Sequence, residues 1–245
     1  MSERVYLAKY PLHEALAQEA EHKPQNGWNP NDPKFRHRAV MSLFGDLTDS
    51  ETEADAQSGT SARRAAAGVL FRVDKLPGQP PFFLVQAQLR PEERQGLEVK
   101  QIELSEYPVG QVLGFRIAIN AIRRQKGPES YTRSGKKRGG TKAVPVPFDG
   151  DTEAPEGISR MTPWLESRFV GALIGVEIIN HQREVLGTDR AGRNLRGGSG
   201  RVVQVDTVDG VARVADPEQL LQLQLQGIGR AKSYGCGLLT VRPLA

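Results

Sequence analysis

The sequence predicts an α+β protein built from two tandem ferredoxin-like domains, residues 1–108 and 109–245. Two observations lead to this prediction. In each half, segments with the hydrophobic patterns of strands and helices follow the order strand, helix, strand, strand, helix, strand, which is the ferredoxin-like pattern. The length of 245 residues also fits one or two domains of about 150 residues each.

The first half opens with a strand and a capped helix. Arg4–Tyr10 is rich in strand-forming residues, and residues 11–31 follow as an irregular segment. Asp32 is suited to cap a helix and Pro33 to occupy its first position. Apolar residues then recur every three or four positions over residues 35–44, which predicts an amphipathic helix.

Three further strands complete the first half. Residues 46–62 contain five acidic residues and no Lys or Arg, which favours a mobile loop. Strands are expected at Gly68–Val73 and Phe82–Leu89, followed by one or two helical turns at Arg90–Gly96. Leu97–Ser105 alternates apolar and polar residues, as a strand with one buried face does.

The second half starts with a strand at Val112–Ile119 and a basic loop over residues 122–144. A helix is expected at Met161–Val170 and a strand at Leu173–Ile179. Residues 181–200 are rich in Gly and Arg and predict an irregular connection.

The last part of the chain predicts a hairpin, a helix and a final strand. The Asp209-Gly210 pair favours a tight turn between two strands. Asp216 before Pro217 is a helix-capping signal, and Gly227 ends this helix. The strands expected here are Arg201–Thr207, Val211–Val214 and Leu238–Val241.

Composition excludes several classes of protein. The single cysteine, Cys236, rules out an internal disulfide and a cysteine-based metal cluster. No apolar run is long enough for a signal peptide or a membrane span, so we expect a cytoplasmic protein with no membrane contact. A hydrophobic content of 38% predicts a globular chain.

Charge is distributed unevenly and points to an anionic partner. Residues 1–108 hold 13 basic and 16 acidic residues, whereas residues 109–245 hold 20 basic and 13 acidic ones. Two loops concentrate the cations, and either loop alone is also consistent with a solvated surface. The candidate nucleic-acid contacts in these loops are Lys136, Lys137, Arg138, Lys142, Arg190, Arg193, Arg196 and Arg201.

A glycine-rich run, Gly227–Leu239, follows the last helix. Its glycines permit sharp bends and close approach to a ligand, and its cations suit a phosphate. Neither a P-loop nor a dinucleotide fingerprint is present, because the spacing and the helix-to-strand order differ. A tight connector is equally consistent with the pattern. The candidate contacts are Gly227, Gly229, Arg230, Lys232, Gly235 and Gly237.

His37 is the candidate catalytic residue. It lies in the capped helix between Arg36 and Arg38, at the border of the apolar face. A half-exposed histidine beside cations stays neutral near pH 7 and can accept a proton. As a single residue it is more simply explained as a partly buried surface histidine. None of the four histidines has metal-ligand spacing, so we expect neither a metal nor a cofactor.

Four segments resemble one family. FRHRAVMSLF at residues 35–44, FRIAINAIRR at 115–124, VVQVDTVDGVARVADPEQL at 202–220 and GIGRAKSYGCGLLTVRPL at 227–244 are similar to the CasE family. These are the CRISPR repeat-RNA endoribonucleases of the type I-E Cascade complex. The resemblance extends over nearly the whole chain, and the C-terminal glycine-rich run is its most specific part.

The resemblance implies a fold of two ferredoxin-like domains of the RNA-recognition-motif type. It also implies binding of the repeat stem-loop in the precursor transcript and cleavage at the 3′ base of the hairpin without a metal. The product would stay bound, with other Cascade subunits as partners. The family's catalytic histidine corresponds to His37 and the following arginine to Arg38. Lys34 stands where some members have a tyrosine, and we expect Lys34, Arg36 and Arg38 to contact RNA.

The residues fit this chemistry, because RNA carries its own nucleophile in the 2′-OH. Removing that proton allows in-line attack on the phosphate, which leaves a 2′,3′-cyclic phosphate and a 5′-OH. One histidine cannot be both base and acid in one step, so the second role is open. Two alternatives also remain: a non-catalytic RNA-binding module of the same fold, and a nucleotide-binding enzyme that uses the glycine-rich run.

Overall fold

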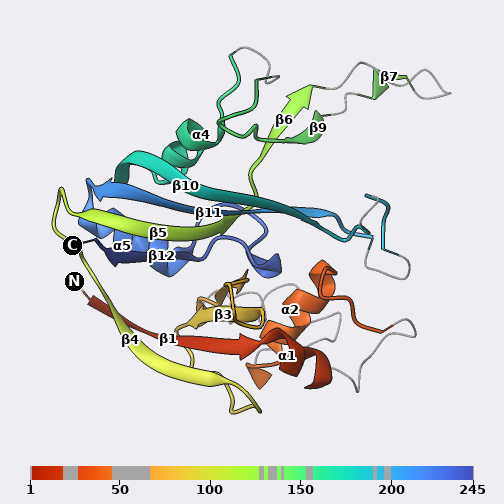
Figure 1. The fold of residues 1–245 in the computed structure, drawn as a ribbon, viewed down its shortest axis with the longest axis vertical. Coiled ribbons are helices and arrows are strands. Elements are labelled where there is room, and N and C mark those ends of the chain that lie inside the picture. The colour runs from red at the N-terminus through yellow and green to blue at the C-terminus, as the bar shows by residue number, and fades with distance from the viewer. Residues whose placement is uncertain are drawn as a thin grey trace.

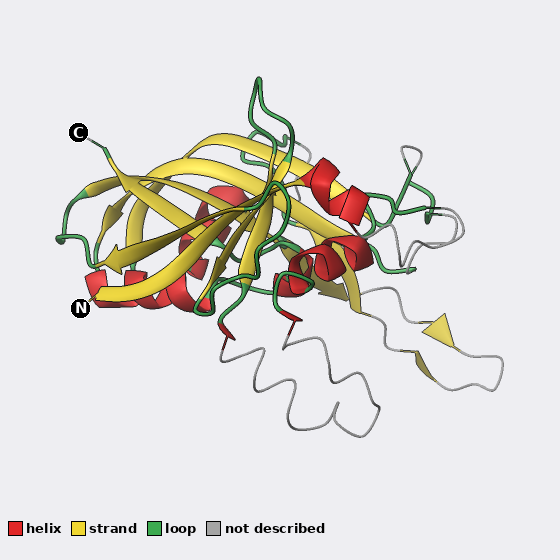
Figure 2. Ribbon diagram, turned by 90° about the horizontal axis from the view of Figure 1, so that it is seen from below, coloured by secondary structure: helices red, strands yellow, loops and turns green. Residues whose placement is uncertain are grey.

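A computed structural model describes residues 2–18, 27–45, 67–126, 130–131, 137–138, 141–152, 157–189, 192–195 and 200–244. It contains two four-stranded antiparallel sheets (Figures 1 and 2). The strands of the first sheet lie within residues 2–105 and those of the second within residues 112–243. The predicted domain boundary falls in the segment that connects them.

The first sheet has the strand order β2-β3-β1-β4. Its core forms where the helix α2 packs on the sheet, and Phe35 of the helix lies 6.3 Å from Phe83 of β3, ring centre to ring centre. The elements are β1 (Ser2–Pro11), α1 (Leu12–Gln18), α2 (Pro33–Met41), β2 (Leu70–Asp74), β3 (Phe82–Ala87) and β4 (Glu98–Ser105).

The second sheet has the order β10-β11-β5-β12. Phe115 of β5 and Phe169, just after α4, pack edge to face at 5.4 Å in its core. The elements are β5 (Val112–Ile119), α4 (Met161–Arg168), β10 (Leu173–Leu186), β11 (Val203–Val214), α5 (Pro217–Gln226), the 3₁₀ turn η4 (Lys232–Tyr234) and β12 (Leu239–Pro243).

Both sheets therefore place their strands in the order second, third, first, fourth along the chain. This is the ferredoxin-like arrangement, and the predicted fold class is confirmed. Two local expectations in the first half were wrong. Residues 12–18 form the helix α1 rather than an irregular segment, and residues 90–96 are irregular with one turn at 95–96 rather than helical. Arg90–Gly96 has no apolar face to hold a helix on the sheet, and Gly96 adopts a φ of 73°.

The expected hairpin at Asp209-Gly210 was also wrong, because both residues lie inside the continuous strand β11. Gly210 pairs with Ile178 on one side and Phe115 on the other. A Cβ added at Gly210 would lie 2.5 Å from the Glu177 carbonyl oxygen and 2.6 Å from the Phe115 ring. The glycine is needed for close packing within the sheet and not for a turn.

Strand pairing also occupies part of the predicted basic loop. β6 (Ile122–Lys126) pairs with β9 (Thr141–Pro145), and β7 (Ser130–Tyr131) pairs with β8 (Lys137–Arg138). This ribbon projects from the second sheet (Figure 1). The sequence did not predict these strands, because an exposed two-stranded ribbon needs no apolar face and so lacks the alternating apolar pattern of a strand.

The two sheets are joined by specific hydrogen bonds. The Gln86 side chain on β3 donates to the Gln224 carbonyl of α5 at 2.8 Å, and both residues are buried. Beyond the end of β10, the Gly187 amide donates to the Asn31 carbonyl just before α2, at 2.7 Å. The first bond joins β3 to α5, and the second holds the start of α2 against the second half of the protein. In the described part of the chain, no helix has the length and apolar character needed to cross a membrane.

Candidate functional site

The helix α2 forms as predicted from its capping signal. The Asp32 side chain accepts a hydrogen bond from the Lys34 amide at 2.9 Å, and Pro33 occupies the first turn. Phe35, Ala39 and other apolar residues bury one face of the helix in the first core. The opposite face is thereby held outward in a fixed orientation.

Lys34, His37 and Arg38 share this outward face. Lys34 is exposed, whereas His37 and Arg38 are half-buried. The Arg38 guanidinium stacks over the Trp28 ring at 5.6 Å. His37 and Arg38 follow Lys34 by three and four residues, so both side chains are neighbours of Lys34 on the helix surface. The cations on this face with His37 are thus Lys34 and Arg38, whereas the sequence suggested Arg36 and Arg38.

The glycine-rich loop, residues 227–237, bends four times at glycines. Gly227, Gly229, Gly235 and Gly237 all have φ between 70° and 94°, a region that residues with a Cβ rarely adopt. A Cβ on Gly227 would lie 2.6 Å from Leu70 of the first sheet. The glycines therefore let the loop pack closely against both halves, whatever else it contacts.

The loop brings its 3₁₀ turn η4 against α2 and β2 (Figure 1). The His37 helix and the candidate phosphate-binding loop, distant in sequence, are thus side by side. Lys232 of η4 donates from Nζ to the Gln226 carbonyl at 2.6 Å. Burial lowers the pKa of Lys232. Cys236 is fully buried beneath the loop, and burial raises the pKa of its thiol to about 12, so the thiol is inert near neutral pH.

Tyr234 is a candidate contact that sequence reasoning missed. Its hydroxyl accepts a hydrogen bond from Arg201, whose guanidinium also lies 6.0 Å from the ring centre. Arg201 is exposed and thus joins the edge of the site through Tyr234. An aromatic residue between two glycine bends was the available signal, since aromatic rings interleaved with cations are common in RNA-binding surfaces.

Arg36 does not fit the role of RNA contact expected for it. Its side chain is 3% exposed and pairs with Glu184 of β10 at 2.9 Å. It also donates from Nε to the Pro30 carbonyl at 3.2 Å. Arg36 therefore connects α2 to the second sheet instead of facing solvent.

The remaining predicted cations are only partly placed. Lys142 is exposed on β9, and the exposed Arg193 pairs with Asp189 at 2.9 Å. Arg230 is exposed at the first bend of the glycine-rich loop. Lys137 and Arg138 lie on β8. Lys136, Arg190 and Arg196 lie outside the described residues, as does the acidic segment 46–62.

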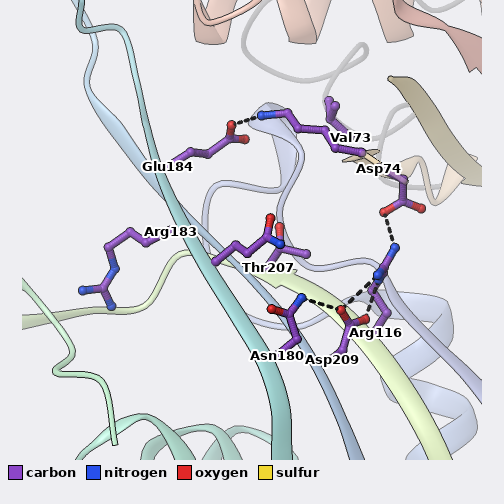
Figure 3. Close-up of a pocket in the computed structure, with 10 residues that line it drawn as sticks. Val73, Asp74, Arg116, Asn180, Arg183, Glu184, Thr207 and Asp209 are labelled. Atoms are coloured by element: carbon purple, nitrogen blue, oxygen red, sulfur yellow. Dashed lines mark hydrogen bonds and ion pairs between the residues drawn. The ribbon is translucent and has the colours of Figure 1, made fainter. Parts of the chain in front are cut away.

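A polar pocket of about 170 Å³ lies at the junction of the two sheets (Figure 3). Arg116 of β5 binds Asp209 through two hydrogen bonds of 2.5 and 2.9 Å and lies 3.6 Å from Asp74 of β2. The hydrogen bond from Arg116 to Asp209 raises the pKa of the guanidinium despite burial. Burial alone would raise the pKa of Asp209, but the hydrogen bonds from Arg116 and Asn180 outweigh it and the pKa is lowered.

The other end of this pocket holds a second ionic cluster. Lys75 of the first half reaches Glu184 at 2.6 Å, and Glu184 also receives Arg36. Burial opposes ionisation of Glu184, yet the charges of Arg36 and Lys75 keep its pKa below the usual value. Because its acidic and basic side chains are paired, we interpret the junction pocket as a structural connection between the sheets. The candidate site remains at α2 and the glycine-rich loop.

Among the described residues, no three His, Cys, Asp or Glu side chains come together as a metal site would require. The expectations of no metal and no cofactor stay predictions.

The chain is similar to several known proteins. It is 30% identical to the CRISPR system Cascade subunit CasE of Escherichia coli (strain K12) over 150 residues, which are 60% of this chain and 66%, just under two thirds, of that protein. The crystal structure of Cas6e from Escherichia coli K-12 matches with a TM-score of 0.62 at 22% identity, covering 98% of this chain and 100% of that one.

The structure of Thermus thermophilus Cse3, bound to an RNA representing a pre-cleavage complex, also matches with a TM-score of 0.62. It is 21% identical, and the match covers 98% of this chain and 100% of that one. These two likenesses concern the fold. The sequence model of the family described as "CRISPR associated protein" matches residues 5–243. Since this match spans nearly the whole chain, the protein belongs to the CRISPR associated protein family.

Proposed function

We propose that the protein is an endoribonuclease that binds the stem-loop of CRISPR repeats and cleaves the precursor RNA at the 3′ base of the hairpin. The observation that carries the proposal is the position of His37 on the outward face of α2, the helix that packs against η4 of the glycine-rich loop. The relatives support it, because one is named a Cascade subunit and another is titled as bound to a pre-cleavage RNA.

The reaction proposed is attack by the RNA's own 2′-OH. His37 would move one proton, either from that hydroxyl or to the leaving 5′-oxygen, and such a group contributes about 10²–10⁴-fold. Breaking the P–O5′ bond then leaves a 2′,3′-cyclic phosphate and a 5′-OH. Lys34, Arg38 or Lys232 would stabilise the charge that develops on the phosphate. Lys232 suits this role because it is half-buried on η4, which packs against α2.

The direct test compares His37→Ala with the wild type in single-turnover cleavage of a repeat hairpin in EDTA. We expect the wild type to cleave and the variant to be slower by about 10²–10⁴-fold, with unchanged affinity for the hairpin. His13→Ala is the matched control, because His13 is an exposed histidine on α1. A 2′-deoxy substitution just 5′ of the cut should block cleavage in every variant.

The results separate this proposal from its alternative. If His37→Ala cleaves at the wild-type rate, the catalytic assignment is wrong. If the wild-type protein binds the hairpin tightly but never cuts it, the protein is a non-catalytic RNA-binding module. Cleavage that requires added magnesium would contradict the proposed chemistry.

We further propose that the cleaved RNA remains bound and that the protein joins other Cascade subunits on it. Another structural relative is titled as a CRISPR RNA-guided surveillance complex, and it matches with a TM-score of 0.57. If about five phosphates are neutralised, the logarithm of the binding constant should fall against the logarithm of salt with a slope of about −4 to −5. Replacing Arg190, Arg193 and Arg196 together should weaken binding more than it slows cleavage of bound RNA.

A further inference from the structure

A groove of about 320 Å³ lies where β5 ends and β6 begins, between α4 and the first bend of the glycine-rich loop. We call it the arginine groove. It lies outside the catalytic helix and shares only Gly229 and Arg230 with the glycine-rich loop described above. The lining residues that matter are Asn120, Arg123, Arg124, Trp164, Arg168 and Arg230.

The arginine groove carries uncompensated positive charge. Its lining contains four arginines and no acidic residue. In the part of the chain that the structure describes, none of these four makes an ion pair, whereas Arg36 and Arg116 at the sheet junction both do. Like charges held close together without counter-ions favour the binding of an anion.

Arg123 supplies a second and independent observation. Its Nε atom is buried and has no hydrogen-bond partner among the described residues. A buried donor on a charged group is unfavourable until an acceptor reaches it. A phosphate oxygen is such an acceptor, and the planar guanidinium fork suits phosphate geometry.

The groove is also lined by the Trp164 ring and the Arg168 guanidinium of α4. Trp164 of α4 packs against the second core, which fixes its ring. Arg168, one turn later, stacks on that ring at 4.8 Å. Unpaired bases stack on tryptophan and on arginine planes, and this stacking tolerates any base.

From these observations we infer that the arginine groove binds one unpaired nucleotide of the RNA, adjacent to the hairpin. The phosphate contacts Arg123, Arg124 and Arg230, and the base lies toward Trp164 and Arg168. The inference rests on the proposed RNA substrate and adds a site for the single-stranded part of it. A volume of about 320 Å³ is at the lower end of the range of ligand pockets, about 300–1,000 Å³, which is room for one nucleotide and not for a paired stem.

The groove is connected to the candidate catalytic helix by the glycine-rich loop. Gly229 and Arg230 line the groove, and three residues further on the same loop packs against the His37 helix through η4. RNA that leaves the stem and enters the groove is therefore held by the same loop that packs against the helix of the candidate catalytic residue. Such an anchor fixes the direction in which the chain crosses the site.

The first experiment uses the intrinsic fluorescence of Trp164. The chain has two tryptophans, so Trp28→Phe leaves Trp164 as the sole reporter and keeps an aromatic ring under Arg38. We expect a short single-stranded RNA to quench this fluorescence in a saturable manner. The double variant Arg123→Gln/Arg124→Gln, made in the same background, should lose the quenching. The control is Arg213→Gln, an exposed arginine on β11 outside the groove.

The second experiment compares a bare repeat hairpin with hairpins that carry unpaired nucleotides at the 5′ or 3′ end. One flank should tighten binding by roughly 5- to 100-fold, the range expected for one stacked base. Arg123→Gln/Arg124→Gln should abolish that gain and leave the bare hairpin's affinity unchanged, whereas Arg213→Gln should leave both unchanged.

The outcomes separate the inference from the proposed function. If the double variant weakens bare and flanked hairpins equally, or if no flank adds affinity and Trp164 is not quenched, the arginine groove is not a nucleotide site, although hairpin cleavage stands. If the wild type neither binds nor cuts any hairpin, the proposed function fails instead.

Discussion

Arg36 and Arg193 should respond in opposite ways to the same substitution. Both arginines were expected from the sequence to contact RNA. The structure buries Arg36 against Glu184 and exposes 81% of the Arg193 side chain, which pairs with Asp189. Arg36→Met should therefore change stability and leave the salt dependence of RNA binding intact, whereas Arg193→Met should do the reverse.

The size of the stability effect follows from the contacts. Removing one partner of a fully buried ion pair costs about 3–5 kcal/mol. Glu184 is 27% exposed and keeps Lys75 at 2.6 Å, so the loss should be smaller, about 1–3 kcal/mol. For a chain of this length, about 2 kcal/mol corresponds to roughly 4–8 °C in the unfolding midpoint. The exposed pair of Arg193 should contribute less than about 1 kcal/mol.

The effect of Arg36→Met should also depend on pH. The pKa of Glu184 is lowered in the folded state, so its contribution is present above the pKa of the unfolded chain and is lost as pH falls through the folded pKa. Since Arg36 is one cause of that lowering, the variant should lose less stability than the wild type on acidification below the ordinary glutamate pKa.

The assays are thermal unfolding at several pH values and binding of an uncleavable 2′-deoxy hairpin at several salt concentrations. Arg193→Met should reduce the slope of log affinity against log salt by about 0.7–0.9, as expected for one lost phosphate contact. If Arg36→Met instead reduces that slope and leaves the unfolding midpoint unchanged, the assignment of Arg36 to the sheet junction is refuted.

Three further predictions concern packing and the glycine-rich loop. Gly210→Ala should lower the free energy of unfolding by about 1–3 kcal/mol, because its Cβ would lie 2.5 Å from a backbone carbonyl of β10. Denaturant unfolding measures this loss. Gly150→Ala is the neutral control, because nothing lies within 4 Å of a Cβ added there. Cys236 should resist a thiol reagent at pH 8 in the native protein and react at once after unfolding, because burial raises the pKa of its thiol to about 12. Rapid labelling of the native protein would show instead that the loop opens. Gly237→Ala should slow hairpin cleavage and lower the unfolding midpoint. Its φ is 94°, and its Cβ would lie 3.0 Å from the Ile228 carbonyl. An unchanged cleavage rate would show that this bend is not needed for the site.

Local signals predicted those elements whose structure is set locally. Both capped helices begin where the sequence indicated, because Asp32 and Asp216 accept backbone hydrogen bonds within their own first turns. The strand order along the chain then left few topologies, and the ferredoxin-like one was correct. The domain boundary at residues 108 and 109 lies between the sheets and stays a prediction.

The errors arose where tertiary contacts override a local signal. Asp209-Gly210 is a strong turn signal, but pairing with β5 and β10 on both sides holds it in a strand. The burial of Arg36 was within reach of the sequence, since position 36 lies three and four residues before the buried Ala39 and Val40. Its partner Glu184 was not, because the contact joins residues 148 positions apart.

The same limit applies to the candidate site. His37 and the glycine-rich loop were each found from the sequence, but their proximity follows only from how the two sheets dock. The arginine groove was not found, since its lining comes from β5, β6, α4 and the loop, and two of its arginines stand in a segment read as a basic loop.

The two faces of α2 connect the junction to the proposed chemistry. Arg36 enters the ionic cluster with Glu184, His37 lies on the outward face, and the helix itself packs against η4 of the glycine-rich loop, which belongs to the second half of the chain. The distance between the imidazole and an RNA held by that loop therefore depends on how the sheets dock, and not on α2 alone. Because a displacement of about 1 Å can cost roughly 100-fold in rate, a weakened junction should slow cleavage of bound RNA before it weakens binding. A junction of matched charges is suited to this task, since ion pairs fix one register between two surfaces where apolar packing tolerates several.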